Sequence, residues 1–579
     1  VIILSQRDYA PSIHVILINP ATQPFGGFLS RYVPVGIPVA IGMVASYLES
    51  HNIHCRVHDE EIERLTPELL KEKTRGLETP LIFGVSCLTA HVARGYQIAR
   101  MIKAHFPGST TIFGGLHPTT LPEEALQTGC VDYVVRGEGE EIMLQLYRAL
   151  RGEGTAEDLL GVSFVREGEI IHNPEAPLIP DLNVIPPFPY HLFNHPKYDM
   201  GFLVSSRGCP YRCSYCSQRL LTGTTYRYLS ADRIVDDIET VLSYGQNAIV
   251  FYDDNFCLKP RRIEKMCNLI VERGLHNKVK LSVQTRADNV VNQGGEDLVR
   301  QMSESGFTHM GFGLETGSQR LANLVKKDET VEIHLEAAEL CQKYGIDVSF
   351  FMIFGLPTET DEDRRQSFDI VRGAGLQATK FNNLIPYPGT PLWTELKDSG
   401  RVVQTKDWGN FDSVLAMTTS IFDKTPLPYV PETCSEWQLK RDIIRYNLKS
   451  YVNRKSIAAI LGHTKGIGWF VLPEKWYTKP RELFEMSKIG IHLVTNIIMT
   501  SLPLWLSEFI MQTLNPRLRE RPRIRGYDSS TYQTVEWDKI AVTRKRDLLR
   551  TARLEREKTG QFSVKIPQDE LATESSSLG

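Results

Sequence analysis

Short apolar runs that alternate with amphipathic helical stretches restrict the fold of this chain more than any other feature of its sequence. Over residues 13–172 the apolar runs lie at 14–20, 81–88, 110–119 and 133–140. An apolar run of this length is typical of a strand that is buried on both faces of a parallel sheet. We therefore predict a doubly wound, flavodoxin- or Rossmann-like α/β domain over residues 1–172.

A sheet of this kind binds its ligand beyond the carboxyl ends of its strands. Glycines at that edge let a large flat ligand come close to the backbone. The residues that we expect at this edge are Asn19, Gly26, Gly27, Ser86, Leu88, Gly114, Gly115, Gly137 and Glu138.

A second series of the same kind predicts a barrel over residues 199–424. Its expected strands are 201–206, 248–254, 280–286, 309–316, 347–355 and 378–387, with helical patterns between them. This series indicates an incomplete parallel (β/α)6 barrel of the TIM type, which builds its site at the carboxyl ends of the strands. The polar residues at those ends are Asp253, Asp254, Arg286, Glu315 and Asn382.

The other segments differ in composition from these two domains. Residues 173–198 are rich in proline and predict an extended linker, because proline removes a backbone donor and fixes φ. Residues 425–515 predict a mostly α-helical region. Residues 516–579 are rich in arginine and lysine and predict an exposed basic tail.

Residues 489–507 contain no Asp, Glu, Lys or Arg over 19 positions. This length borders on that of a membrane-spanning helix, but Pro503 would kink such a helix. Three interpretations remain open: a helix that lies in the membrane interface, a helix that lines the substrate cavity, and an ordinary core helix.

Three of the ten cysteines, Cys209, Cys213 and Cys216, lie in one eight-residue stretch directly after a predicted strand. Structural zinc is closed by four ligands, whereas three thiolates suit a [4Fe–4S] cluster in which one iron has no protein ligand. Tyr215 would shield such a cluster. A zinc site with a distant fourth ligand and three unrelated thiols are the alternatives.

The cysteine stretch, CPYRCSYC, resembles the signature of the radical SAM enzymes, and the later motifs follow in the order of that family over about 200 residues. The resemblance implies that the three cysteines hold the cluster and that S-adenosylmethionine (SAM) chelates the open iron. It places Asp253 and Asp254 at the SAM amino group, Arg286 at its carboxylate and Glu315 at its ribose. The other residues expected at SAM are Tyr215, Gly355, Pro357 and Asn382.

Two of these assignments have simpler alternatives. Asp253 and Asp254 could cap the helix that follows them. Arg286 could form an ion pair on the surface. For Glu315, which lies in an otherwise apolar strand, a buried carboxylate with a hydrogen-bond donor is the favoured interpretation.

The amino-terminal domain resembles the cobalamin-binding domain that precedes the barrel in one subclass of this family. The residues that carry this resemblance are the S-x-L of 86–88, the Gly-Gly of 114–115 and the RGEGE of 136–140. The D-x-H-x-x-G motif of that domain is absent, since residues 19–27 read NPATQPFGG. The resemblance therefore implies cobalamin without a histidine ligand from this position, or a domain retained only for packing.

Together the resemblances imply reductive cleavage of SAM to a 5′-deoxyadenosyl radical. The leading interpretation is cobalamin-dependent methylation of an unactivated carbon on a small-molecule or lipid-like substrate, and the alternative is radical cyclisation of a porphyrin- or lipid-like substrate. A third possibility, from another class, is an iron–sulfur electron carrier. An external reductant such as flavodoxin or ferredoxin is expected.

Location and partners follow from charge and cysteine content. A net charge of −3 gives no general attraction to nucleic acid. Sparse cysteines and no recognisable secretory signal indicate the cytoplasm, with peripheral membrane contact through 489–507 as an addition. The chain begins at Val1, so we expect an initiator methionine to precede it.

Overall fold

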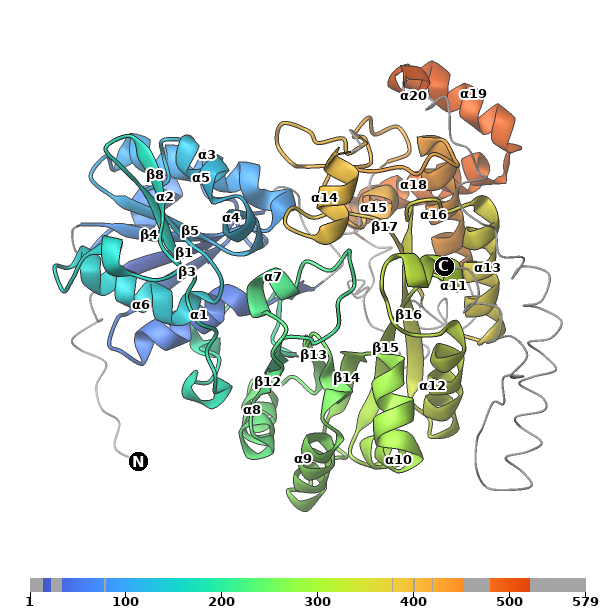
Figure 1. Cartoon of the computed structure of the whole chain (residues 1–579), viewed down its shortest axis with the longest axis horizontal. Helices are drawn as coiled ribbons and strands as arrows, with labels where there is room; N and C mark the ends of the chain where they lie inside the picture. Colours follow the sequence, from blue (N-terminus) through green and yellow to red (C-terminus); the bar gives the residue numbers. More distant parts are fainter. Residues whose placement is uncertain are drawn as a thin grey trace, which may run out of the picture. The chain divides into compact units, whose positions relative to one another are not determined.

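The structure is a computed structural model, and it describes residues 14–21, 34–77, 80–376, 379–398, 401–418, 420–451 and 479–520. Two sheets, one in each predicted α/β region, organise these residues (Figure 1).

The amino-terminal sheet has the strand order β3-β1-β4-β5-β6-β7-β8. Its parallel strands are β1 (Val15–Asn19), β3 (Cys55–Asp59), β4 (Ile82–Ser86), β5 (Thr110–Gly114) and β6 (Tyr133–Val135), and β7 (Val162–Arg166) and β8 (Glu169–His172) add an antiparallel edge. The parallel part has the order of flavodoxin-like sheets, so the predicted doubly wound domain is confirmed. The apolar runs did not reveal β3, since its sequence CRVHD is mostly polar.

Helices cover both faces of this sheet. Their bounds are α1 (Val39–Glu49), α2 (Pro67–Lys73), α3 (Val92–His105), α4 (Leu116–Thr120), α5 (Pro122–Gln127) and α6 (Gly139–Leu150). One core lies between the sheet and α1 with α6, and a second lies between the other face and α2, α3 and α5. The flavodoxin-like order changes direction between β1 and β4, and ligands bind beyond the strand ends at such a point.

The second sheet is parallel throughout, and its strands follow chain order. They are β10 (Phe202–Leu203), β13 (Ala248–Phe251), β14 (Lys280–Thr285), β15 (Phe307–Glu315), β16 (Asp347–Phe354) and β17 (Lys380–Asn383). The helices between them are α8 (Ala231–Ser243), α9 (Pro260–Glu272), α10 (Gly295–Glu304), α12 (Val331–Lys343) and α13 (Asp361–Gly373). The predicted partial (β/α)6 barrel is therefore confirmed.

Local sequence explains where several barrel helices begin. The side chains of Ser230, Thr330 and Thr360 each accept a hydrogen bond from the backbone N–H three residues later. At Thr360 the Asp363 carboxylate returns the bond to the Thr360 N–H, which completes a capping box.

A carboxy-terminal set of helices follows the barrel, and α15 (Leu415–Thr418) and α16 (Glu436–Tyr451) of this set pack on the edge strand β17 of the barrel. Further members are α14 (Pro391–Asp398), α18 (Pro480–Ser501), α19 (Leu504–Leu514) and α20 (Arg517–Glu520). On α16, the Asn447 side chain accepts a hydrogen bond from the Phe381 N–H at 3.2 Å and donates one to the Phe381 carbonyl at 2.8 Å. An edge strand without a neighbour exposes unpaired backbone N–H and C=O groups. The Asn447 side chain of α16 supplies hydrogen-bond partners for two such groups of β17. Within the described residues, no helix is both long enough and apolar enough to cross a bilayer.

Close packing of α3 on its sheet generates a stability prediction. A Cβ atom at Gly95 would lie 2.5 Å from the Cys87 Sγ and 3.1 Å from the Phe113 ring. We expect Gly95→Ala to lower the free energy of unfolding by about 1–3 kcal/mol, because the side chain overpacks a filled core.

Gly373, at the end of α13, is the matched control, because nothing lies within 4 Å of a Cβ there. Gly373→Ala should be neutral or stabilise by up to about 1 kcal/mol, since alanine favours a helix. Urea denaturation of both variants measures the difference, and equal effects would contradict the packing explanation.

Candidate functional site

The cysteine loop lies between β11 (Ser206–Arg207), which follows the first barrel strand, and α7 (Arg219–Thr222). Gly208 has φ +88°, and a Cβ there would lie 2.2 Å from the Thr225 carbonyl oxygen, so only glycine fits. Further along the loop, the Ser214 N–H donates to the Val325 carbonyl at 2.9 Å. The loop is therefore fixed by the backbone at both of these points.

Asp253 and Asp254 follow β13 and support the entrance to this loop. The Asp253 carboxylate is buried and accepts hydrogen bonds from the Ser205 N–H (2.6 Å), the Ser205 hydroxyl (2.5 Å) and the Ser206 hydroxyl (2.6 Å). The Asp254 carboxylate accepts from the Gly208 N–H at 2.8 Å. Neither carboxylate caps a helix, because the residues at the N-caps of the following helices are Asn255 and Lys259.

The three thiols differ in exposure: Cys213 is buried, whereas Cys209 and Cys216 are partly exposed. Burial raises the pKa of the Cys209 thiol, and the Tyr211 N–H and the Arg286 guanidinium act in the opposite direction. Burial also raises the pKa of the Cys216 thiol, to about 11. In a protein without metal Cys209 and Cys216 are therefore thiols, and binding of a metal would release their protons.

The chemistry of this donor set fits an iron–sulfur cluster better than a single ion. Across the described ranges of the chain, no group of three or more His, Cys, Asp or Glu side chains is placed to hold one metal ion. A zinc ion needs four ligands converging on one point, whereas a cluster takes each thiolate on a different iron. The three cysteines of one loop fit the second arrangement.

Arg286, at the end of β14, lies over the ring of Tyr211, with 3.4 Å between its Cζ atom and the ring centroid. It donates to the Asp288 carboxylate at 2.9 Å and to the Lys327 carbonyl at 2.9 Å, and it lies 3.5 Å from the Glu329 carboxylate. Because the side chain is buried, the alternative of a surface ion pair is wrong. Because Tyr211 lies between Cys209 and Cys213, Arg286 is in direct contact with the cysteine loop.

Glu315 ends β15 with φ +64° at a register shift in the pairing with β16. Positive φ is uncommon for a residue with a side chain, and such positions cluster at functional sites. The buried carboxylate lies near the Tyr215 side chain and 3.7 Å from the Lys327 Nζ. It thereby joins the loop of the three cysteines to the centre of the barrel.

The sequence analysis did not identify Lys327 and Glu329, which share this buried network. The Lys327 Nζ lies 3.3 Å from the Glu329 carboxylate, and both side chains are buried. The run KKDE at 326–329 has the composition of a solvated loop. In the structure, exposed Lys326 and Asp328 alternate with buried Lys327 and Glu329, unlike the residues of a fully solvated loop. The sequence alone does not reveal this alternation.

The remaining residues expected at SAM lie after β16 and on β17. Gly355 has φ +91°, and its N–H donates to the Glu359 carboxylate at 2.6 Å. Pro357 follows in the same turn and precedes α13. The Asn382 Oδ1 is buried without a hydrogen-bond partner in the protein, and buried acceptors of this kind require an explanation. A ligand with an N–H or O–H group would satisfy it.

The edge expected to bind cobalamin is open at several positions. The Leu88 side chain is 58% exposed, which is unusual for leucine at the end of a buried strand. Gly137 has φ +87° and nothing lies within 4 Å of a Cβ there, and at Gly114 the nearest atom lies 3.7 Å away. Gly115 is different, because its Cβ would meet the Cys87 backbone at 2.9 Å. This edge could accept a large flat ligand.

Other members of that set have partners or lie elsewhere. The Asn19 side chain donates to Asp59 at 2.9 Å, and Ser86 ends β4 beside Gly115. Gly26 and Gly27 lie outside the described residues.

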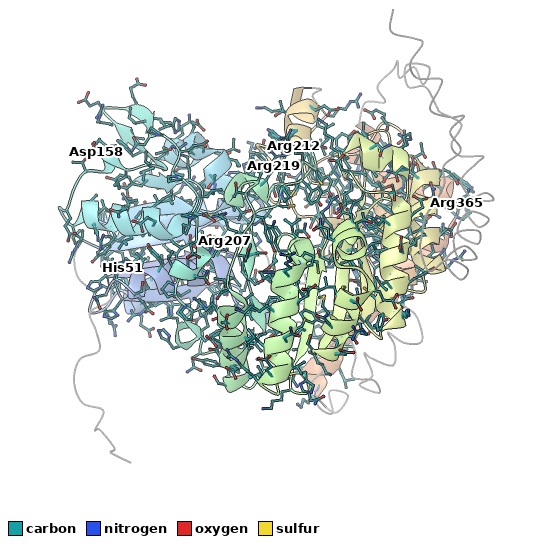
Figure 2. All side chains as sticks on the ribbon, turned by 60° about the horizontal axis from the view of Figure 1, so that its bottom comes forward. His51, Asp158, Arg207, Arg212, Arg219 and Arg365 are labelled. Carbon is teal, nitrogen blue, oxygen red and sulfur yellow. The ribbon has the colours of Figure 1, made fainter. Side chains whose placement is uncertain are left out.

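Glu138 connects the two domains. Its buried carboxylate accepts from Arg207 at 3.1 Å, from Arg227 at 2.6 Å and from the Ile179 N–H at 2.8 Å. Arg207 also pairs with the Glu140 carboxylate at 2.5 Å. Figure 2 labels Arg207 together with Arg212 and Arg219, which come from the same segment as the cysteines. The motif after β6 is therefore bound directly to the strand that precedes Cys209.

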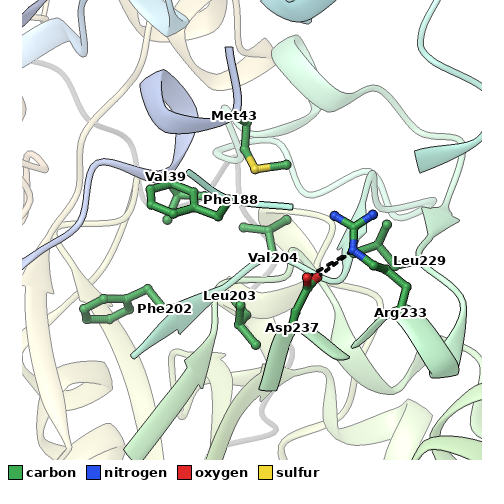
Figure 3. A pocket seen from close by; sticks show the side chains of 9 residues that line it. All are labelled: Val39, Met43, Phe188, Phe202, Leu203, Val204, Leu229, Arg233 and Asp237. Atoms are coloured by element: carbon green, nitrogen blue, oxygen red, sulfur yellow. Dashed lines mark hydrogen bonds and ion pairs between the residues drawn. The ribbon is translucent and has the colours of Figure 1, made fainter. Parts of the chain in front are cut away.

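An apolar cavity lies apart from these residues, between α1, the linker, β10 and α8 (Figure 3). Its lining is Val39, Met43, Phe188, Phe202, Leu203, Val204, Leu229, Arg233 and Asp237. The only polar groups there, Arg233 and Asp237, pair with each other at 3.0 Å, so this cavity offers no free polar group to a cofactor.

Comparison with known proteins agrees with this geometry. A family profile described as the radical SAM superfamily matches residues 203–371, and one described as the B12 binding domain matches residues 28–147. An uncharacterized methyltransferase of Pyrococcus horikoshii is 28% identical over 409 residues, which cover 69% of this chain and 86% of the relative. The anaerobic magnesium-protoporphyrin IX monomethyl ester cyclase of Cereibacter sphaeroides is 27% identical and covers 69% and 66%. The hopanoid C-3 methylase of Methylococcus capsulatus is 25% identical and covers 72% and 77%.

Two solved structures share the fold. The radical SAM methyltransferase TsrM of Kitasatospora setae, with cobalamin and a [4Fe–4S] cluster bound, has a TM-score of 0.58 at 20% identity and covers 68% of this chain and 79% of its own. The cobalamin-dependent SAM radical enzyme OxsB has a TM-score of 0.62 at 15% identity and covers 87% and 75%. The predicted radical SAM barrel and B12-binding domain are both confirmed.

The buried charges of the barrel generate a second stability prediction. We expect Lys327→Met to lower the free energy of unfolding by about 3–5 kcal/mol, because Glu315 and Glu329 would lose a buried cation. Lys326→Met, one residue earlier and exposed, should change it by less than about 0.5 kcal/mol. Denaturant unfolding measures both, and a similar loss in the two variants would contradict the role given to Lys327.

Proposed function

We propose that this chain, a radical SAM enzyme with a B12-binding domain, methylates an unactivated carbon of a small-molecule substrate. One observation carries the proposal: the Glu138 carboxylate, after the strand end of one domain, pairs with Arg207, after the strand end of the other. Parallel α/β sheets bind ligands at their carboxyl ends, so this ion pair brings the ligand edges of both sheets together. Methyl transfer from one cofactor to a radical made by the other needs such an arrangement.

Cys209, Cys213 and Cys216 would hold the [4Fe–4S] cluster, and Tyr215, Asp253, Asp254, Arg286, Glu315, Gly355, Pro357 and Asn382 remain the proposed SAM set. When bound, the cluster supplies the electron that cleaves SAM into methionine and a 5′-deoxyadenosyl radical. Within this set the contacts support two different roles. Asp253 and Asp254 accept hydrogen bonds that fix the loop backbone, whereas the Asn382 Oδ1 has no partner and could accept a hydrogen bond from SAM.

Ser86, Leu88, Gly114, Gly115 and Gly137 would hold cobalamin, together with Asn19, Gly26, Gly27 and Glu138 from the sequence motifs. When bound, cobalamin supplies the methyl group. The open space at Gly137 and the exposed Leu88 side chain support this assignment. Glu138 contributes by joining the domains, because its carboxylate is already bound by two arginines.

The proposed reductant is an acidic electron carrier such as flavodoxin or ferredoxin. Arg212, between Cys209 and Cys213, is exposed. An exposed positive charge in the loop would attract an acidic carrier to the cluster and raise the association rate.

Several relatives support a hydrophobic substrate. Their names include a hopanoid methylase, a bacteriochlorophyllide methyltransferase and a protoporphyrin ester cyclase, which supports a lipid- or porphyrin-like substrate for this chain. The similarity to the cyclase supports radical cyclisation of a porphyrin- or lipid-like substrate as the second candidate function. The alternative of an electron carrier has no such support, because the family match covers most of the barrel.

The first test concerns the cluster ligands. We expect Cys213→Ala to abolish formation of 5′-deoxyadenosine from SAM and dithionite after anaerobic reconstitution, because the cluster loses a ligand. Cys267→Ala removes a buried thiol from α9 of the same barrel and should retain iron and activity. Full activity in Cys213→Ala would refute the assignment of the cluster to this loop.

The second test separates methylation from cyclisation. Methyl transfer through cobalamin consumes a second SAM, so S-adenosylhomocysteine should accumulate together with 5′-deoxyadenosine in about equal amounts. Mass spectrometry of turnover mixtures, with cobalamin supplied and extracts of lipids and tetrapyrroles as substrate source, measures both products. Substrate-dependent 5′-deoxyadenosine without S-adenosylhomocysteine would favour the cyclase.

A further inference from the structure

The helices α18 and α19 carry large apolar side chains on the side that faces away from the rest of the described chain, in addition to those buried against α16. Their outward side carries Phe484, Ile491, Val494, Ile498, Trp505 and Phe509, which we call the α18–α19 apolar face. Ile491 is 67% exposed and Trp505 is 71% exposed. A surface helix of a soluble domain normally turns its apolar stripe towards the core.

The inward side of the same helices contains polar groups. Asn496, Thr500 and Ser507 are buried. The Ser507 hydroxyl accepts a hydrogen bond from the Trp437 indole N–H of α16 at 3.1 Å, and the Thr500 hydroxyl donates to the Asn496 carbonyl at 2.7 Å. The Thr500 and Ser507 hydroxyls are thus hydrogen-bonded inside while large apolar side chains face outwards. Exposed apolar patches of this kind mark sites of interaction with membranes or other proteins.

Both helices are held by the same neighbour, so their outward sides belong together. Met499 of α18 and Met511 of α19 pack in one cluster with Trp437 and Ile444 of α16. The Leu502 carbonyl, between the two helices, accepts a hydrogen bond from Arg441 of α16 at 2.8 Å. The apolar face therefore lies on the side of both helices that is turned away from α16. Figure 1 shows α19 at the margin of the described helices.

We propose that the α18–α19 apolar face binds the surface of a lipid bilayer with anionic headgroups, without crossing it. From Ile489 to Ser507 there is no Asp, Glu, Lys or Arg, so this stretch offers no partner for the ion pairs that often form at the rim of a protein interface. Tryptophan and phenylalanine beside aliphatic residues, with cations at the ends, are typical of helices that lie in the membrane interface.

Charge at the margins supports anionic headgroups. The exposed cations Lys479 and Arg481 lie at the start of α18, and Arg519 lies in α20 directly after α19, whereas Lys488 is paired with Glu485 at 3.0 Å. The sequence continues from there with Arg521, Arg523 and Arg525. Each basic residue near an anionic surface strengthens binding by electrostatic attraction. This proposal does not depend on the reaction that the barrel catalyses.

The test is flotation of the full chain with vesicles of phosphatidylcholine that contain about a quarter phosphatidylglycerol. We expect the wild-type protein to float with these vesicles. The triple variant Ile491→Ser, Ile498→Ser, Trp505→Ser should float at least about tenfold less, because each replaced side chain loses apolar burial. The matched control Leu160→Ser, Val165→Ser, Val184→Ser replaces other exposed apolar residues and should float like the wild type.

Three outcomes would overturn the proposal: no flotation of the wild type, equal flotation of the triple variant, or loss of a wild-type dimer in the triple variant without an effect on flotation. Sedimentation velocity detects the dimer, which would identify a second copy of the chain as the occupant. Formation of 5′-deoxyadenosine by the triple variant would show that this variant is folded. Flotation does not measure methylation, so a failure of membrane binding and a failure of the proposed methylation would be observed in separate experiments.

A second measurement does not depend on the stability of the triple variant. Lipids brominated near the headgroup should quench tryptophan fluorescence in the wild type, and Trp505→Phe should lose that quenching while still floating. Equal quenching in both proteins would overturn the placement of Trp505 in the bilayer.

Discussion

The buried ion pairs of Glu138 with Arg207 and Arg227 are the interaction on which the arrangement of the two domains depends. Separating two charges from water is costly, and such pairs persist where geometry and further hydrogen bonds compensate. Here the Glu138 carboxylate has three donors, and Arg207 has a second acceptor in Glu140. Because Arg207 lies two residues before Cys209, the amino-terminal domain and the cysteine loop are fixed to each other by short connections.

A second contact between the domains lies after the last barrel strand. Trp408 packs its ring at 5.0 Å from the buried His117 ring, and its indole N–H donates to the Glu124 carboxylate at 3.0 Å. Ile385 and Phe411 join the core of the amino-terminal domain in the same region. The barrel is thus attached through segments that follow its first and last strands, which leaves the ligand edges of the two sheets near each other.

The sequence predicted the order of most strands and helices because the parallel strands of both sheets are buried on both faces. Apolar runs are clear in such strands, as in 14–20, but they fail where a strand is polar, as in β3, and in the antiparallel pair β7–β8, where Glu169 and His172 are exposed. The motif residues could be located by their position after strands. Their partners could not, because contacts such as that of Arg286 with Tyr211 join segments that are far apart in the chain.

The contacts around the barrel also indicate why so many charged residues stand at its strand ends. A loop with three thiols has few apolar side chains to hold it, so its backbone must be fixed by hydrogen bonds to rigid elements. Asp253 and Asp254 supply the acceptors at its start, and the Val325 carbonyl accepts from the Ser214 N–H near its end. Each of these carboxylates is buried or nearly so and would be unfavourable without its donors. The loop and the barrel therefore stabilise each other, and a ligand bound by the loop would take a position that the barrel strands have already set.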